Sequence, residues 1–279
     1  MSSRCFVRFA VLAVVLLLAS PASARNAEML LSPTRVVLEG ANRFATVTVR
    51  NNGDGVGRYK IELVDTVMAE NGGIRIREEG SRDEFSAMDM LSLSPRSMTL
   101  KPDESQTVRI LVKMKGDLPD GEYRSHLQVR MTENDLDLAT NKPATDGASV
   151  VLKPKMTTVI PVIIRNGATS YKVSVDEAQL VTGGGDGKPV PQVKLALSFS
   201  GNRSVLGDVK VTHVAAEGKE TQLAFFRGIA IYRGLAKREQ TVDLTVPEGV
   251  NVHKGRLRVA FMSQEAEGSQ VLSEKEITP

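Results

Sequence analysis

Residues 45–53 read ATVTVRNNG, and this stretch sets the pattern for the whole chain. Ala45, Val47 and Val49 are apolar, and the residues between them are polar, as in a β-strand with one buried face. The closing NNG supplies the backbone freedom of a turn between strands. The same period of two recurs at residues 59–63, 108–113, 127–131, 193–199, 242–246 and 257–261. We therefore expect an all-β protein, and short strands separated by Gly, Pro and Asn favour a pair of β-sandwiches.

The N-terminus has the composition of a secretion signal. Arg4 and Arg8 form a basic region, residues 9–19 form an apolar core, and Ala22-Ser23-Ala24 is a small-residue cleavage site. We predict a signal peptide at residues 1–24 that is cleaved near Ala24. The apolar core is shorter than the ~20 residues that a membrane-spanning helix requires, and no later run reaches that length. We expect no integral membrane segment.

The length of the mature chain indicates two domains. Removing 24 of the 279 residues leaves 255, which is too many for one ordinary sandwich. A long apolar run ends at Arg165, and Asn166-Gly167 follows it as a turn signal. We place the boundary there, with one domain at residues 25–165 and the other at residues 166–279.

Composition and charge argue against several classes of function. The formal net charge of +3 falls to about +1 once Arg4 and Arg8 are removed, and no long basic run remains, so nucleic acid is not an expected partner. Cys5 leaves with the signal peptide, which removes disulfides and cysteine-ligated metals. The three histidines lie far apart in the sequence, and no serine stands in a G-x-S-x-G elbow. We expect no metal, no cofactor and no enzymatic activity.

Three stretches carry a resemblance to a known family. They are SPTRV at residues 32–36, LSPRSMTLKPDESQTVRI at residues 93–110 and DGEYRSHL at residues 120–127. Together they resemble the PapD-like periplasmic chaperones of the chaperone-usher pilus pathway, and the middle stretch follows the family's P-x-x-x-x-L-x-P-x-x-x-Q-x-x-R-I pattern. The resemblance covers the first domain well and the second mainly by strand content. It implies two immunoglobulin-like β-sandwich domains in an L-shaped (boomerang) arrangement and a periplasmic location.

The same resemblance implies a non-enzymatic task. Members of the family bind pilus or fimbrial subunits that lack the last strand of their own sandwich, lend them an edge strand, and deliver them to an outer-membrane usher. This donor-strand complementation is a form of β-augmentation, in which main-chain hydrogen bonds give affinity and alternate side chains fill the partner's groove. Because an unpaired edge over an open core aggregates, the subunit needs such a partner.

The order of the strands assigns the lending strand to residues 150–164. It follows the most polar internal stretch, Thr132 to Gly147, which we predict to be a long loop. Within the strand we expect Val150, Leu152 and Met156 to enter the subunit, because they precede the half that must stay paired within the chaperone.

The family also holds the terminal carboxylate of the subunit, using an Arg of the first strand and a Lys of the lending strand. Arg35 matches the first of these by its Thr-Arg context. The place of the Lys falls at Pro161, and the nearest lysines, Lys153 and Lys155, lie further up the strand. Arg165 is a possible substitute by its distance along the chain.

Three other functions stay open. A structural surface or pilus subunit should carry a terminal donor extension, but residues 270–279 are short and charged. A sandwich module that binds carbohydrate or protein is possible, although the absence of Trp and the presence of only four Tyr argue against sugar stacking. A secreted hydrolase lacks a visible pairing of nucleophile and base. The sequence also leaves open whether the free chaperone caps its own edge by forming a dimer.

Overall fold

A computed structural model describes residues 29–78, 80–113, 116, 118–134, 156–184, 189–265 and 270–279. The predicted signal peptide and two of the expected donor residues, Val150 and Leu152, lie outside these ranges. The described chain is built of strands, together with one short 3₁₀ helix, η1 (Met88–Met90). The strands are β1 Met29–Ser32, β2 Val36–Glu39, β3 Phe44–Asn51, β4 Gly57–Val64, β5 Thr66–Met68, β6 Ile74–Ile76, β7 Leu91–Ser94, β8 Ser97–Leu100, β9 Ser105–Val112, β10 Gly121–Asn134, β11 Thr157–Asn166, β12 Tyr171–Gly183, β13 Val190–Gly201, β14 Val205–Val214, β15 Glu220–Ile231, β16 Lys237–Asp243, β17 Arg256–Ser263 and β18 Val271–Ile277.

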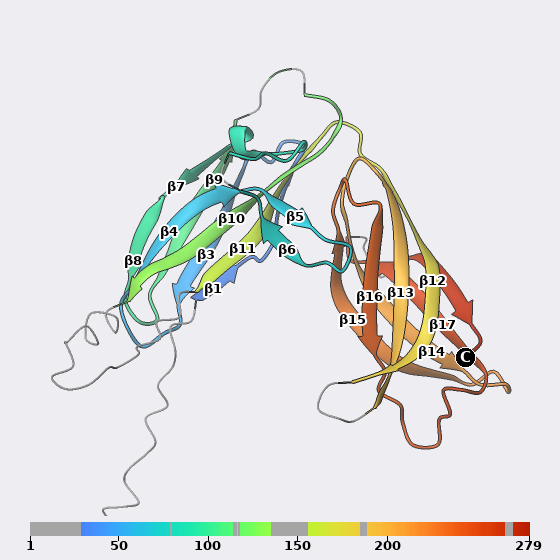
Figure 1. Cartoon of the computed structure of the whole chain (residues 1–279). Helices are drawn as coiled ribbons and strands as arrows, with labels where there is room; N and C mark the ends of the chain where they lie inside the picture. Colours follow the sequence, from blue (N-terminus) through green and yellow to red (C-terminus); the bar gives the residue numbers. More distant parts are fainter. Residues whose placement is uncertain are drawn as a thin grey trace, which may run out of the picture.

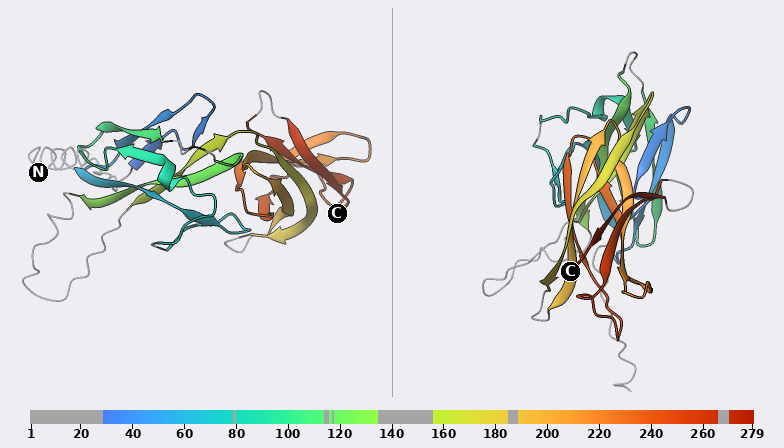
Figure 2. Two further views of the ribbon diagram at one scale, coloured as in Figure 1. Left: turned by 90° about the horizontal axis from the view of Figure 1, so that it is seen from above. Right: turned by 90° about the vertical axis from the view of Figure 1, so that its right-hand side faces the viewer.

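The strands form two β-sandwich lobes, as the alternation predicted. In the N-terminal lobe the sheet β1-β3-β9-β7 packs on the sheet β2-β11-β10-β4-β8, which we call the interface sheet. In the C-terminal lobe the sheet β12-β13-β16 packs on β15-β14-β17-β18. The two lobes lie at an angle to each other in the expected L-shaped arrangement (Figure 1). Seen from above, they lie side by side along the length of the molecule (Figure 2). No described helix has the length and apolar character needed to cross a bilayer.

Each lobe has its own core, which is formed by the apolar residues of the period-two rows. In the N-terminal lobe Val47, Val49 and Ile110 have no exposed surface, and their polar neighbours face outward. The described core of this lobe ends at Ile164, and that of the second lobe begins at Val173. Burial of such rows supplies the main stabilisation of each sandwich, at roughly 25 cal/mol per Å² of apolar surface.

The first part of the chain changes sheets, which determines how β11 is paired. β1 pairs antiparallel with β3, whereas β2 pairs parallel with β11 in the opposite sheet. A cis peptide bond between Ser32 and Pro33 stands at the change. Because β2 begins only at Val36, its register with β11 covers Val162 to Arg165.

β10 is longer than the sequence indicated. The predicted loop beginning at Thr132 is wrong for its first three residues, because β10 continues to Asn134. The strand keeps its pairing with β4 by means of a bulge between Met131 and Glu133, which absorbs one extra residue. Residues 135–147 of the predicted loop lie outside the described ranges.

The β5–β6 hairpin reaches from the N-terminal lobe to the C-terminal lobe (Figure 1). The carbonyl of Glu70 accepts hydrogen bonds from Arg238 Nη1 at 3.2 Å and from the backbone N–H of Glu239 at 2.7 Å. Gly72, at φ +80°, lies where a Cβ atom would collide with the guanidinium of Arg238. A glycine at this turn therefore allows the hairpin to contact β16.

Candidate functional site: an open strand edge and the interface between the lobes

The first half of β11 has a free edge. β10 pairs with the whole strand, from Thr157 to Asn166, whereas β2 pairs only from Val162 onward. Within the part of the chain that the structure describes, no strand pairs with Thr157 to Pro161 on the side of β2. These residues therefore present unpaired main-chain groups at the edge of a sheet.

The side-chain row of β11 changes from core to surface along this edge. Ile160, Val162 and Ile164 are 3%, 0% and 2% exposed and belong to the N-terminal core. Met156, which precedes the strand and accepts a hydrogen bond from the N–H of Met131 at 3.0 Å, is 36% exposed. The expected donor residue Met156 is thus an apolar side chain at the surface, beside the free edge.

The opposite face of the interface sheet carries ionisable side chains in register. Glu122, Arg124 and His126 occupy every second position of β10 and lie across from residues 165, 163 and 161 of β11. All three β10 side chains are buried. This period-two row of polar residues inside a strand is visible in the sequence, but it matches no common catalytic or metal-binding motif.

Arg35 lies immediately before β2, at the interface with the C-terminal lobe. Its Nη2 is 3.4 Å from Ser204 Oγ and 3.7 Å from Glu265 Oε1, and its side chain is 16% exposed. One residue along, Val36 pairs with Val162, so Arg35 stands beside the end of the free edge. The expected anchor Arg35 therefore contacts the C-terminal lobe at the inner end of the free edge.

Arg165, the possible second anchor, is held by three carboxylates of its own chain. Its guanidinium lies 3.2 Å from Glu39, 3.5 Å from Glu122 and 2.6 Å from Glu265, and its side chain is 9% exposed. Burial lowers the pKa of the Arg165 guanidinium, but the hydrogen bonds and charges of these carboxylates outweigh it and raise the pKa overall. Arg203 of the C-terminal lobe also pairs with Glu265, so this carboxylate pairs with one arginine of its own lobe and two of the N-terminal lobe.

A second buried group lies beside this network. His126 Nδ1 is 3.2 Å from Thr66 Oγ1, and its Nε2 is 3.4 Å from the hydroxyl of Tyr232 in the C-terminal lobe. Burial, and then the charges of Arg124 and Arg35, lower the pKa of His126 to about 3, so its ring is neutral at physiological pH. Nothing local in the sequence marks His126 as more than a strand residue, because Tyr232 is 106 positions away.

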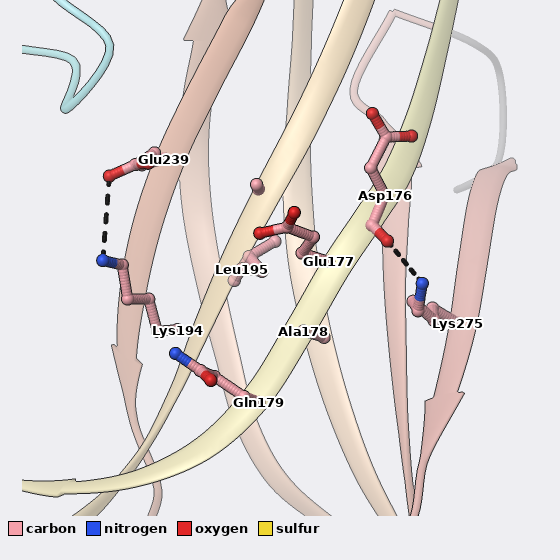
Figure 3. A pocket seen from close by; sticks show the side chains of 9 residues that line it. Asp176, Glu177, Ala178, Gln179, Lys194, Leu195, Glu239 and Lys275 are labelled. Atoms are coloured by element: carbon pink, nitrogen blue, oxygen red, sulfur yellow. Dashed lines mark hydrogen bonds and ion pairs between the residues drawn. The ribbon is translucent and has the colours of Figure 1, made fainter.

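A shallow groove on the C-terminal lobe is a weaker candidate (Figure 3). Lys194 pairs with Glu239 at 3.9 Å, and Lys275 donates a hydrogen bond to the carbonyl of Asp176. Hydrogen bonds from two neighbouring serines lower the pKa of the Asp176 carboxyl. These charged groups of the groove therefore already interact with partners within the protein. In the described ranges, no group of three or more His, Cys, Asp or Glu residues could hold a metal ion.

The fold is similar to that of several solved chaperones, although no protein-family model and no curated protein matches the chain. One similar structure is the CsuC–CsuE chaperone–tip adhesion subunit complex of Acinetobacter baumannii, with 12% identity, 90% of this chain and 98% of that chain covered, and a TM-score of 0.44. Another is the complex of Salmonella enterica SafA pilin with the SafB chaperone, with 16% identity, 91% of this chain and 98% of that chain covered, and a TM-score of 0.44. A third is the E. coli chaperone DraB, with 16% identity, 91% of this chain and 97% of that chain covered, and a TM-score of 0.42. At these scores the similarity does not by itself assign a function.

Proposed function

We propose that this protein is a periplasmic chaperone that binds pilus or fimbrial subunits by lending them an edge strand, and that it passes them to an outer-membrane usher. The observation that carries the proposal is the free edge of β11 between Thr157 and Pro161, with the exposed Met156 at its outer end. The motifs at residues 32–36, 93–110 and 120–127 support it independently, because they resemble the PapD-like family.

The free edge suits β-augmentation physically. The half of β11 from Val162 to Arg165 is fixed between β2 and β10, so the unpaired half is held in an extended shape before a partner arrives. Such preorganisation lowers the entropy that binding must otherwise overcome. A subunit strand that pairs along the edge would gain main-chain hydrogen bonds and would cover Met156 and the residues that precede it, including Leu152 and Val150.

Arg35 is the proposed anchor for the terminal carboxylate of the subunit. It stands beside the inner end of the free edge, and its contacts with Ser204 and Glu265 are long, at 3.4 and 3.7 Å. A charge-assisted hydrogen bond there would contribute roughly 1.5–3 kcal/mol. Arg165 would join the anchor only by giving up Glu265, to which it is bound at 2.6 Å.

The proposal is tested by purifying the tagged mature protein from the periplasm of its host and identifying the chains that co-elute. We expect a small β-rich subunit at about one-to-one stoichiometry. Met156→Asp should abolish recovery of the subunit while leaving the melting temperature of the chaperone unchanged. Arg35→Ala should lower the recovery of the subunit. The matched controls are Leu111→Asp, at an apolar residue that is 50% exposed on the other sheet, and Arg130→Ala on the outer half of β10.

Other outcomes would replace the proposal. A protein that elutes alone while pili are being made would point to a sandwich module that binds another ligand, or to a structural surface subunit. A drop in melting temperature with Met156→Asp would assign Met156 to the protein's own core. A concentration-dependent dimer that dissociates when the subunit is added would show that the free edge caps itself in the absence of a subunit.

A further inference from the structure

Two arginines at the interface stack reciprocally on aromatic rings of the opposite lobe. The guanidinium carbon of Arg124, in the N-terminal lobe, lies 3.8 Å from the ring centroid of Tyr232 in the C-terminal lobe. The neighbouring Arg233 crosses the other way, and its guanidinium carbon lies 3.6 Å from the ring centroid of Phe85. Arg233 Nη1 also donates a hydrogen bond to the backbone carbonyl of Glu122 at 3.0 Å. A guanidinium that stacks by its face keeps its remaining N–H donors available at the edge of the plane.

Arg124 is buried and has no paired anion among the residues that the structure describes. The residue is only 7% exposed, and its guanidinium makes no hydrogen bond or ion pair with any described residue. His126, two residues along the same face of β10, and Tyr232, in the opposite lobe, are both neutral at physiological pH. A cation that loses part of its solvation on burial gains from a nearby anion, so an arginine that has no ion-pair partner among the described residues is a candidate ligand for one.

The carboxylates around Arg124 do not offset this burial. Asp83, Glu122 and Asp65 each act on the guanidinium by charge alone, without a hydrogen bond to it. Burial outweighs them and lowers the pKa of Arg124 below its ordinary value. For Arg165 on the next strand the balance is the reverse, because its carboxylates are in direct contact.

Arg124 and Arg233 line one cavity between the lobes, with a volume of ≈ 200 Å³. Its wall contains three arginines, since Arg77 joins them, but only two carboxylates, those of Asp83 and Glu84. Arg77 and Asp83 pair with each other at 3.0 Å, so the other charged residues that line the cavity are the two stacked arginines and the exposed Glu84. The excess of one positive charge suits a singly charged anion, and a planar carboxylate matches the donor geometry of a guanidinium.

We propose that this cavity is a carboxylate-binding site in which Arg124 and Arg233 are the ligands. Each lobe supplies one of the two arginines, so a bound carboxylate would bridge the lobes. The site is separate from the Arg35 anchor of the proposed function, because Arg35 does not line the cavity. The carboxylate can come from the terminus of a bound polypeptide or from a free small molecule, and the two sources share the same chemistry.

The test is a titration of the ¹⁵N-labelled mature protein with sodium acetate, matched against sodium chloride at equal ionic strength. The side-chain Nε–Hε signals of Arg124 and Arg233 are followed by NMR. We expect a saturable shift with acetate that chloride does not produce. Arg124→Gln should weaken acetate binding by about tenfold or more, whereas Arg130→Gln, on the same strand but 46% exposed at its side chain, should leave it unchanged.

Several results would overturn the site. They are the absence of an acetate-specific shift in the unchanged protein, an equal shift in the Arg124→Gln variant, and tighter binding of inorganic phosphate than of acetate. If Arg124→Gln fails to fold, Arg233→Gln takes its place, because Arg233 is only half-buried and its loss should also weaken acetate binding.

Two peptides distinguish the sources of the carboxylate. Acetyl-Val-Thr-Val as the free acid, but not as the amide, should compete with acetate if the ligand is the terminus of a polypeptide. Binding of acetate with no effect of either peptide would assign the site to a free small carboxylate. Neither result depends on recovery of a subunit from the periplasm, so the site and the proposed function can fail separately.

Discussion

Two arginines on one face of the interface sheet are both largely buried and yet differ in their surroundings. Arg165 of β11 is enclosed by three carboxylates, whereas Arg124, one strand away on β10, stacks on the ring of Tyr232 and forms no ion pair with a described residue. The first arginine joins the two lobes within the free protein. The second feels nearby carboxylates only at a distance, without an ion pair in the described part of the chain. This difference separates a structural ion-pair network from a site that is open to a ligand.

The contrast also shows why a cation's place in the sequence is a poor guide to its role. Arg165 was a candidate anchor by its distance along the chain, yet its three carboxylate partners come from β2, β10 and the C-terminal lobe. A guanidinium that already makes such contacts must lose them before it can bind a new anion. Arg35, with only long contacts, and Arg124, with no ion pair to a described residue, do not bear that penalty to the same extent.

The largest expected effect is that of Arg165→Met. It leaves Glu122, whose side chain has no exposed surface, as a buried charge without its cation. We expect the free energy of unfolding to fall by about 3 kcal/mol, as measured by urea denaturation. A fall of less than about 1 kcal/mol would mean that the network contributes no more than a surface ion pair. Arg165 and Arg124 would then not differ in their contribution to stability.

The next effect is a dependence of stability on pH through His126. Its pKa of about 3 in the folded protein lies below the ordinary value of 6.5, so below pH 6.5 the unfolded chain binds a proton that the folded chain does not. Stability from this group is therefore complete above pH 6.5 and is lost as the pH falls toward 3, at up to about 1.4 kcal/mol per pH unit.

His126→Gln should flatten that slope, and His253→Gln, at an exposed histidine, should not. The groups that face His126 are Arg124 and Arg35, which lower its pKa, and Asp83, which raises it less. We therefore expect Arg124→Met to raise the His126 pKa in an NMR titration of the ring protons. An unchanged His126 pKa would show that the charge of Arg124 has no effect on the protonation of His126.

Arg124→Met should change stability far less than Arg165→Met. The variant loses a stacking contact with Tyr232 but also removes a buried charge that has no ion pair with a described residue, and the two effects oppose each other. We expect a change within about 1 kcal/mol in the urea midpoint analysis at low carboxylate concentration. A loss as large as that of Arg165→Met would reveal an anionic partner for Arg124 within the free protein.

The smallest effect is expected for Arg130→Gln, which serves as the surface reference. Arg130 Nη2 lies 3.7 Å from Glu62 Oε2, and the two side chains are 46% and 36% exposed. Exposed pairs of this kind contribute about 0.5 kcal/mol or less. In the same denaturation measurement, Arg130→Gln should change the free energy of unfolding less than substitution of either buried arginine. A larger loss would show that the effect depends on the position along β10 and not on burial.

The alternation of apolar and polar residues was sufficient to predict the all-β fold, because each sandwich buries one face of every strand. Val47 and Val49 are buried as expected, and so are their counterparts in β9 and β13. The pattern could not show the end of β10, where a bulge after Met131 carries the strand through Thr132. A bulge changes the pairing without changing the composition, so it leaves little trace in the sequence.

Local patterns in the chain were thus enough to predict the all-β class and the two-sandwich organisation. They placed Arg35 and Met156 inside strands, and this was wrong, because Arg35 lies just before β2 and Met156 just before β11. The folded arrangement was needed to learn which edge of β11 is free, which arginines already hold carboxylates, and that Arg124 meets Tyr232 across the interface. The cause is the range of the interactions. Strand periodicity is a local property of the chain, whereas an ion pair or an open edge depends on which distant segment folds beside it.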